Sequence, residues 1–227
     1  MDFTGQRASD LNHHWELGNN WLKKARDCES SIAASYAAFE FRLALERLAF
    51  QYWFQLEGEH ATMEDAIHAS HSLKRMEQFI YRVGGNQLRI DRQFDLVRIF
   101  FDELGIERSF ATPQVGQLSS HWHTCSDYCH IGWTIFQEAL EDRLEVYDKL
   151  GMIADYLRVQ IDGIIGWPGL PVAERTDLNS IVDDFVTGKI GADELRSFIK
   201  SKGLWAKVVY NDGRPAEFAG RAVPPEN

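Results

Sequence analysis

The 227-residue sequence predicts an all-α fold, a helical bundle of five to six helices followed by a small C-terminal helical module and a possible short β-hairpin. Two observations lead to this class. Apolar residues recur at helical spacing through most of the chain, and capping residues or glycines stand where that spacing stops. Hydrophobic residues make up 44% of a chain that is long enough to bury a core without disulfides.

The first two predicted helices carry the clearest apolar pattern. The first follows Ser9 and Asp10 and runs to about Arg26. The second covers residues 32–56, after the capping pair Ser30–Ser31. This second helix has two apolar stripes: Ala34, Ala38, Phe41, Leu45, Leu48 and Tyr52, and Tyr36, Phe39, Leu43, Phe50 and Phe54. A helix that is apolar on two sides is typical of the centre of a bundle.

Two further helices are predicted from their start and stop signals. Thr62 and the acidic residues after it start a helix that runs to about Val83 and stops at Gly84–Gly85. Residues 92–104 form the next helix, and Gly105 ends it.

A long helical stretch follows Thr112–Pro113, which is a cap followed by a first-turn proline. It is expected to break or kink between Ile131 and Gly151, and to end near Ile164–Trp167.

The chain divides into a bundle over 1–165, a linker over 166–172 and a C-terminal module over 173–227. The linker is predicted from its glycines and prolines. The module contains helices over about 177–187 and 192–202. The short apolar runs around Asn211–Asp212–Gly213 suggest the small hairpin.

Composition narrows the function classes. The net charge is −10 and no basic tail is present, so sequence-specific recognition of duplex DNA is not expected. No run of about 18 apolar residues predicts a membrane span. The three cysteines form no disulfide framework and the N-terminus has no signal-peptide pattern, so the expected location is cytoplasmic.

The segment His121–His130 is unusually dense in reactive side chains. Its predicted core stripe contains Trp122, Ser126, Cys129, Trp133, Phe136 and Leu140. His123, Asp127 and His130 also step by four and three, so they are expected to line one flank of that stripe together.

Three interpretations of His123, Asp127 and His130 stay open. They are partly buried helix residues that bond to their neighbours, or metal ligands, or an acid–base or phosphate-contacting site. A metal could also recruit a thiolate from Cys125 or Cys129, although the segment has no CxxC pair. In the third interpretation Asp127 orients His130, which titrates near neutral pH. We take His130, Asp127 and His123 as the candidate catalytic residues, and we expect no metal and no cofactor.

The stretches Ala37–Leu48 and Leu118–His130 resemble HEPN domains, which are compact helical bundles. Many prokaryotic members are toxins or defence ribonucleases that cleave RNA without metal. Their motif pairs an arginine with a histidine a few residues later, and two such motifs meet in a dimer. By this resemblance His130 is the motif histidine and Asp127 or Ser126 stands near its polar position. The similarity covers about residues 10–150.

The motif arginine is missing, since no arginine lies between His121 and His130. Such an arginine holds the scissile phosphate. Arg42, Arg47 or Arg75 could reach in from another helix. Two hypotheses follow from the resemblance. One is a non-catalytic interaction or RNA-contacting protein of a prokaryotic defence or toxin–antitoxin system. The alternative is a metal-independent ribonuclease that uses His130. Both allow RNA as a ligand, and a protein partner or a homodimer is expected.

Other polar residues have simpler interpretations. Arg42 and Glu46 are four residues apart and can pair on one helix face. His60, His68 and His71 are expected on a solvated face.

Overall fold

The computed structural model describes residues 4–57, 62–107, 110–130, 140–164, 176–202, 205–208 and 217–221. Its elements are α1 (Thr4–Cys28), α2 (Ser31–Glu57), α3 (Met63–Ala69), α4 (Leu73–Gly84), α5 (Gln87–Leu104), α6 (Val115–Cys129), α8 (Leu140–Ile164), α9 (Thr176–Thr187), α10 (Ala192–Lys202), β1 (Trp205–Val208) and β2 (Glu217–Arg221). The predicted all-α class is confirmed.

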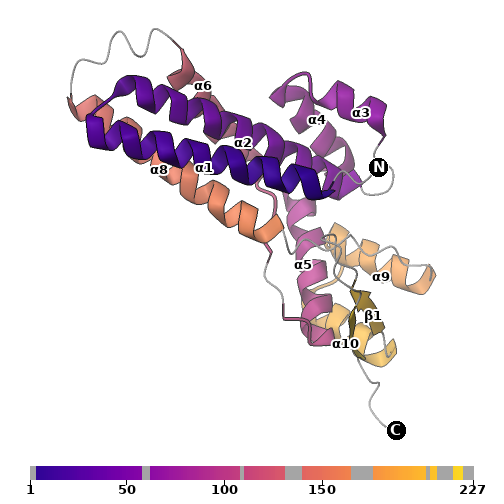
Figure 1. Ribbon diagram of the computed structural model, residues 1–227. Helices are drawn as coiled ribbons and strands as arrows, with labels where there is room; N and C mark the ends of the chain where they lie inside the picture. Colours follow the sequence, from indigo (N-terminus) through magenta and orange to yellow (C-terminus); the bar gives the residue numbers. More distant parts are fainter. Residues whose placement is uncertain are drawn as a thin grey trace.

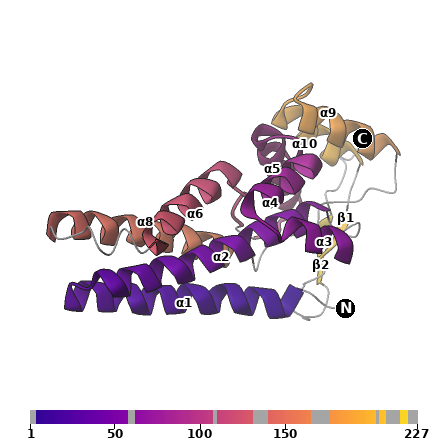
Figure 2. The same ribbon diagram turned by 90° about the horizontal axis from the view of Figure 1, so that it is seen from above.

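Helix α2 lies at the centre of the bundle. It packs against α1, α4, α6 and α8, and Figures 1 and 2 show α1 and α2 lying side by side along most of their length. Its first predicted stripe is buried throughout, from Ala34 to Tyr52. The start of the second stripe faces solvent, since Tyr36 and Phe39 are about half exposed.

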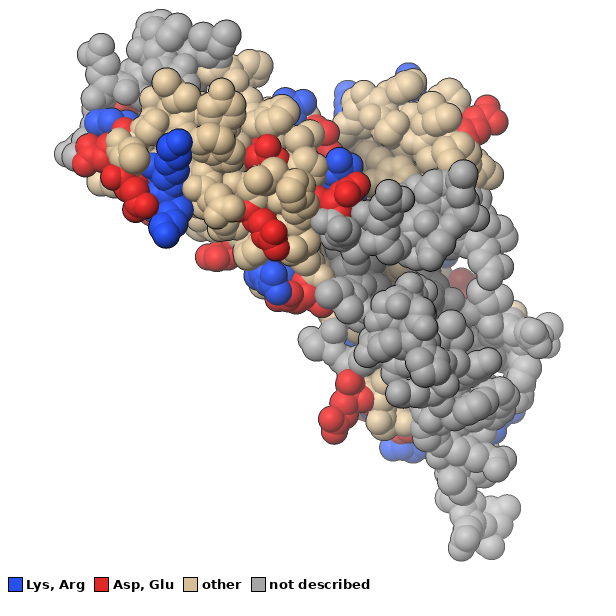
Figure 3. All heavy atoms as spheres, in the orientation of Figure 1, with Lys and Arg blue, Asp and Glu red and all other residues tan. Residues whose placement is uncertain are grey.

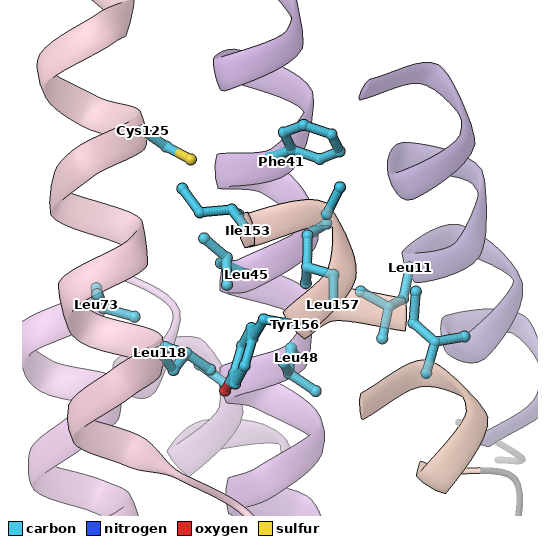
Figure 4. Close-up of a cluster of buried hydrophobic side chains, with 14 of the residues drawn as sticks. Leu11, Phe41, Leu45, Leu48, Leu73, Leu118, Cys125, Ile153, Tyr156 and Leu157 are labelled. Atoms are coloured by element: carbon cyan, nitrogen blue, oxygen red, sulfur yellow. The ribbon is translucent and has the colours of Figure 1, made fainter. Parts of the chain in front are cut away.

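The main core lies where α1, α2, α6 and α8 meet (Figure 4). The labelled side chains of this region are Leu11, Phe41, Leu45, Leu48, Leu73, Leu118, Cys125, Ile153, Tyr156 and Leu157. A cluster of polar side chains also lies inside it. The Tyr52 hydroxyl donates to Gln160 Oε1 at 2.9 Å and lies 3.0 Å from the Tyr156 hydroxyl, so α2 and α8 are joined by buried hydrogen bonds.

Several predicted helix boundaries are confirmed by their hydrogen bonds. The Ser30 hydroxyl accepts from the Ala33 N–H at 3.2 Å, and the Thr62 hydroxyl accepts from the Asp65 N–H at 3.1 Å. Gly105 ends α5 with a φ of 67°, a left-handed backbone conformation that glycine adopts without strain.

The single helix predicted from Thr62 to Val83 is wrong, because the chain turns at residues 70–72 and forms two helices. Ser72 has an extended backbone and its hydroxyl accepts from the Arg75 N–H at 3.2 Å. Serine competes for backbone donors in this way, and it therefore favours a helix start over a helix interior.

Three predicted helix starts are also corrected. Helix α1 begins at Thr4, before Ser9–Asp10, because a capping residue permits a helix start without forcing one. Helix α5 begins at Gln87, before the predicted residue 92, since the Asn86 side chain accepts from the Arg89 N–H at 2.9 Å. Thr112 does not cap α6; its hydroxyl accepts from Arg98 Nη2 at 2.6 Å.

The C-terminal helices α9 and α10 pack on the far end of α5, as Figure 1 shows. Their second core contains Leu96, Ile99, Phe185, Val186, Leu195 and Ile199. Arg196 joins α10 to α5 through Asp102 at 3.0 Å and Glu103 at 2.9 Å. The apolar faces of α9 and α10 therefore pack against α5, so the C-terminal module shares a core with a helix of the 1–165 segment.

The predicted hairpin is confirmed as an antiparallel pair in which Val208 lies opposite Glu217. The expected linker at 166–172, the turn at Asn211–Asp212–Gly213, and the core positions Trp133 and Phe136 lie outside the described residues.

On the face shown in Figure 3, Lys and Arg side chains are interspersed with Asp and Glu in the part of the molecule that is described. No described helix is both long and apolar enough to cross a membrane.

Candidate functional site

Helix α6 is rotated relative to the orientation that its sequence suggested. Cys125 is completely buried and Ser126 is nearly so, whereas Trp122 and Cys129 are only partly buried. Figure 4 shows Cys125 pointing into the core. The centre of the buried face therefore runs through Leu118 and Cys125, and the predicted stripe forms its edge.

The three predicted catalytic residues all lie on the exposed side of α6. His130 is the residue after the last helical turn; its backbone is extended, and its N–H donates to the Asp127 carbonyl at 3.3 Å. The expected shared flank of a buried stripe is wrong, because the rotation of α6 leaves all three side chains exposed.

Thiolate chemistry is disfavoured at both cysteines of α6. Burial raises the pKa of the Cys125 thiol far above its ordinary value, and burial also raises the pKa of Cys129. Protonated thiols are poor nucleophiles and poor metal ligands. Within the described ranges, no three His, Cys, Asp or Glu side chains are grouped so that they could hold a metal ion.

A pocket of about 930 Å³ opens between α2, the corner that joins α3 to α4, and α6. Its walls come from Arg42, Leu43, Glu46, Arg47, Phe50 and Gln51 on α2, from Ala69–Lys74, Met76 and Glu77 at the corner and the start of α4, and from Trp122 and His123 on α6. This volume suits a small ligand or one residue of a larger one. His123 is the predicted site residue that the structure places in this pocket; Asp127 and His130 do not line it.

One side of the pocket is held by an interlocked cluster of three residues. Glu46 Oε1 accepts from the Trp122 indole N–H at 2.8 Å and from Arg42 Nε at 3.2 Å. The Arg42 guanidinium lies over the Trp122 ring, 4.6 Å from its centroid. The predicted Arg42–Glu46 pair is thus confirmed and also fixes α6 against α2, so these charges are largely committed to each other.

The remaining cationic groups of the pocket are uncommitted. Arg47 and Lys74 form no ion pair with any described residue. The imidazoles of His71 and His123 also face this space, and the first has its ring near that of His68 rather than near a carboxylate. Glu77 is the acid in the wall without an ion-pair partner among the described residues. The pocket wall therefore has three basic side chains against two acidic ones, a formal charge of 3 − 2 = +1, within a chain whose net charge is −10.

Sequence reasoning singled out Arg42, Arg47 and His123 but gave no site role to Gln51, Lys74 or Glu77. The corner Ser70–His71–Ser72 was expected inside a continuous helix. No sequence pattern marked Gln51 as a residue of a functional site. Ser72, three residues before Arg75, is the one local feature that could have indicated a helix start beside His71.

The geometry defines an all-α bundle protein with a cation-lined pocket on α2. No family model, no curated protein and no solved structure matches the chain.

Proposed function

We propose that this is a HEPN-like, non-catalytic protein that contacts RNA through the pocket between α2, α4 and α6. The observation that carries the proposal is the gathering of Arg47, Lys74, His71 and His123 without ion-pair partners in the described structure. Phosphate groups are the part of RNA that such side chains bind. Trp122 and Phe50 in the same walls offer apolar surface beside these donors.

The exposed position of His130 favours the non-catalytic form. A general acid or base must reach its proton within hydrogen-bond distance, and His130 lies outside the pocket that gathers the arginines. A role as an accessory component of a prokaryotic defence or toxin–antitoxin system agrees with binding without chemistry.

Replacing both Arg47 and Lys74 by glutamine is expected to weaken the binding of a single-stranded RNA about tenfold or more at low salt, since two phosphate contacts are lost. Fluorescence anisotropy with a labelled RNA of mixed sequence measures the change. The salt dependence of binding should become shallower in the same variant.

The matched control is the pair Lys23→Gln and Arg89→Gln, which removes the same charge from exposed positions outside the pocket. Equal losses in the two double variants would show that RNA responds only to net charge and would refute the pocket as the contact site.

The alternative is a metal-independent ribonuclease that uses His130. It draws support from Arg42, Arg47 and His123, which line one pocket and so bring arginine and histidine together from different helices. Under our proposal, an RNA pool incubated with the protein and a chelator stays intact. Cleavage that His130→Ala abolishes would replace our proposal by this alternative.

A protein partner or a homodimer also remains a proposal. On α8, the large apolar side chains Leu144, Met152 and Val159 are each more than half exposed, and they recur at helical spacing. Such a stripe is typical of a contact surface. Light scattering of the purified protein over a range of concentrations tests the homodimer, which a constant monomer mass would contradict.

A further inference from the structure

We infer that the outward face of α8 is a docking surface for a basic amphipathic helix of a protein partner. This inference rests on the proposed protein partner and adds the chemistry by which that partner is recognised. The docking face consists of the exposed residues Leu144, Asp148, Met152, Asp155 and Val159. None of them lines the pocket between α2, α4 and α6, so the face is separate from the proposed RNA contact.

The docking face occupies one side of α8. Its residues follow each other at steps of four, four, three and four, a spacing that places them along one line of an α-helix. The opposite side of α8 packs against α1 and α2, and Figure 1 shows α8 lying beside α1. That buried side contains Val146, Leu150, Ile153 and Leu157. The docking face therefore points away from the core of the bundle.

Three large apolar side chains of the docking face lie in solvent. Leu144, Met152 and Val159 are each more than half exposed, and they recur over about four turns of the helix. Removing such side chains from water favours association. A partner that matches this spacing is itself a helix, because a helix presents side chains at steps of three and four residues over the same length.

The two acids of the docking face have no basic partner within the described protein. Asp148 and Asp155 are exposed, and neither forms an ion pair or a side-chain hydrogen bond with a described residue. Each stands between two apolar residues of the face. Lys or Arg at the matching positions of a docked helix would pair with them, so the charge of the face selects a basic partner.

The basic side chains beside the docking face do not neutralise these acids, because they are engaged elsewhere. Lys149 Nζ lies 2.7 Å from Glu145 Oε1, and the Arg158 guanidinium binds the Asp162 carboxylate. These two pairs also neutralise Glu145 and Asp162. The uncompensated charge on this side of α8 is therefore negative and lies between the exposed apolar residues.

The positions of the acids disfavour a second copy of the chain as the occupant. In an antiparallel pair of α8 helices, the register that places Leu144 against Val159 of the second copy also places Asp148 against Asp155 of that copy, and the symmetry repeats this contact. In a parallel pair in the same register, each aspartate faces its own counterpart. Like charges at facing positions oppose pairing, so a helix of opposite charge is the better occupant.

The probe for this face is a labelled synthetic peptide of about five helical turns, with leucines at steps of three and four residues and lysines between them. One control peptide has the same composition in scrambled order, and a second has glutamate in place of lysine. Fluorescence anisotropy with the full-length protein measures the three affinities. We expect the ordered lysine peptide to bind about tenfold or more tightly than either control, because only this peptide matches both the apolar spacing and the charge.

Two double variants test the charges of the face. Asp148→Asn with Asp155→Asn should weaken binding of the lysine peptide about fivefold or more, since two facing charge pairs are lost. Asp10→Asn with Asp183→Asn removes the same charge from exposed positions on α1 and α9, and it should leave the affinity unchanged.

Two single variants test the apolar part of the face. Met152→Gln should weaken binding of the same peptide severalfold, because Met152 is the central apolar residue of the face. Ile67→Gln changes a similarly exposed apolar residue on α3 and should leave the affinity unchanged. Both side chains lie in solvent, so neither variant should lower Tm.

Three results would overturn the inference. Equal binding of the ordered and scrambled lysine peptides would show that the protein responds only to peptide charge. Equal losses in the two double aspartate variants would place the contact outside α8. If no peptide binds, and the mass in solution doubles with concentration unless Met152 is replaced, a second copy covers the face and the homodimer is correct.

RNA binding is measured separately with the same variants. The Asp148 and Asp155 double variant should bind RNA as the wild type does, because neither residue lines the pocket. If the ordered peptide binds as expected and no RNA binds, the docking face is supported and the RNA contact is refuted.

Discussion

Replacing Gly18 by alanine is expected to destabilise the protein by about 1–3 kcal/mol, although the same change inside an exposed helix stabilises by about 1 kcal/mol. Gly18 lies within α1, where the helix faces Phe41 of α2. A Cβ at this position would stand 2.4 and 2.5 Å from two ring carbons of Phe41. Phe41 is completely buried, so its ring has no free space into which it could move.

Gly116→Ala provides the matched control. Gly116 lies in the exposed part of α6, and a Cβ there would meet nothing within 4 Å. This variant should gain about 0.5–1 kcal/mol from helix propensity. Urea denaturation of both variants gives the two free energies of unfolding, and a gain in both would show that α1 and α2 are not in close contact.

A double-mutant cycle isolates the contact itself. Adding Phe41→Leu to Gly18→Ala should restore part of the lost stability, because the smaller side chain makes room for the new methyl group. Phe41→Leu alone should destabilise the protein, since it leaves a cavity. Strict additivity of the two losses would contradict the steric explanation.

Raising the pH above about 10 is expected to lower the free energy of unfolding by about 2–3 kcal/mol by pH 12 through Tyr156 alone. Burial raises the pKa of Tyr156 to about 12 and also raises the pKa of Tyr52 well above its ordinary value. Both hydroxyls belong to the buried group that includes Gln160.

The direction of the change in stability with pH follows from the difference between the phenol pKa in the folded protein and in the unfolded chain. The folded protein holds the neutral phenol, while the unfolded chain releases the proton near pH 10. Stability is therefore fully present below pH 10, and it declines as the pH rises through the folded pKa of Tyr156.

Tyr156→Phe separates this effect from general alkaline unfolding. At pH 7 the variant should lose about 1 kcal/mol with its hydrogen bond, while between pH 10 and 12 its stability should decline less steeply than that of the wild type. Chemical denaturation at a series of pH values measures both. Tyr36→Phe, at an exposed position, is the control, and identical slopes for Tyr156→Phe and wild type would contradict the buried network.

Local signals in the sequence account for most of the helix ends. Ser30, Thr62 and Gly105 form caps or stops through atoms a few residues away, and such contacts require no tertiary structure. The same signals failed at Ser72 and Asn86, because these polar residues can stand inside a helix or start one, and the sequence pattern alone does not distinguish the two.

The candidate site was predictable only in part. The segment His121–His130 was recognised as unusual, but its orientation on α6 was not, because several neighbouring stripes were nearly equally apolar. The orientation of α6 was set by its packing against α2. Trp122 lies at the edge of the helix, where its indole N–H donates to Glu46 of α2, and Cys125 takes the core position. His123 consequently faces the pocket, and Asp127 and His130 face solvent.

The sequence by itself determined the helical class, the central position of α2 and the residues that can start or end helices, since these depend on spacing and on short-range hydrogen bonds. Only the tertiary structure decided which residues share the pocket, because Gln51, Lys74 and His123 are far apart in the chain and meet through packing. Only the tertiary structure likewise explains Gly18. In the sequence it is a weak helix former, whereas in the fold the absence of a Cβ leaves the space that the Phe41 ring occupies.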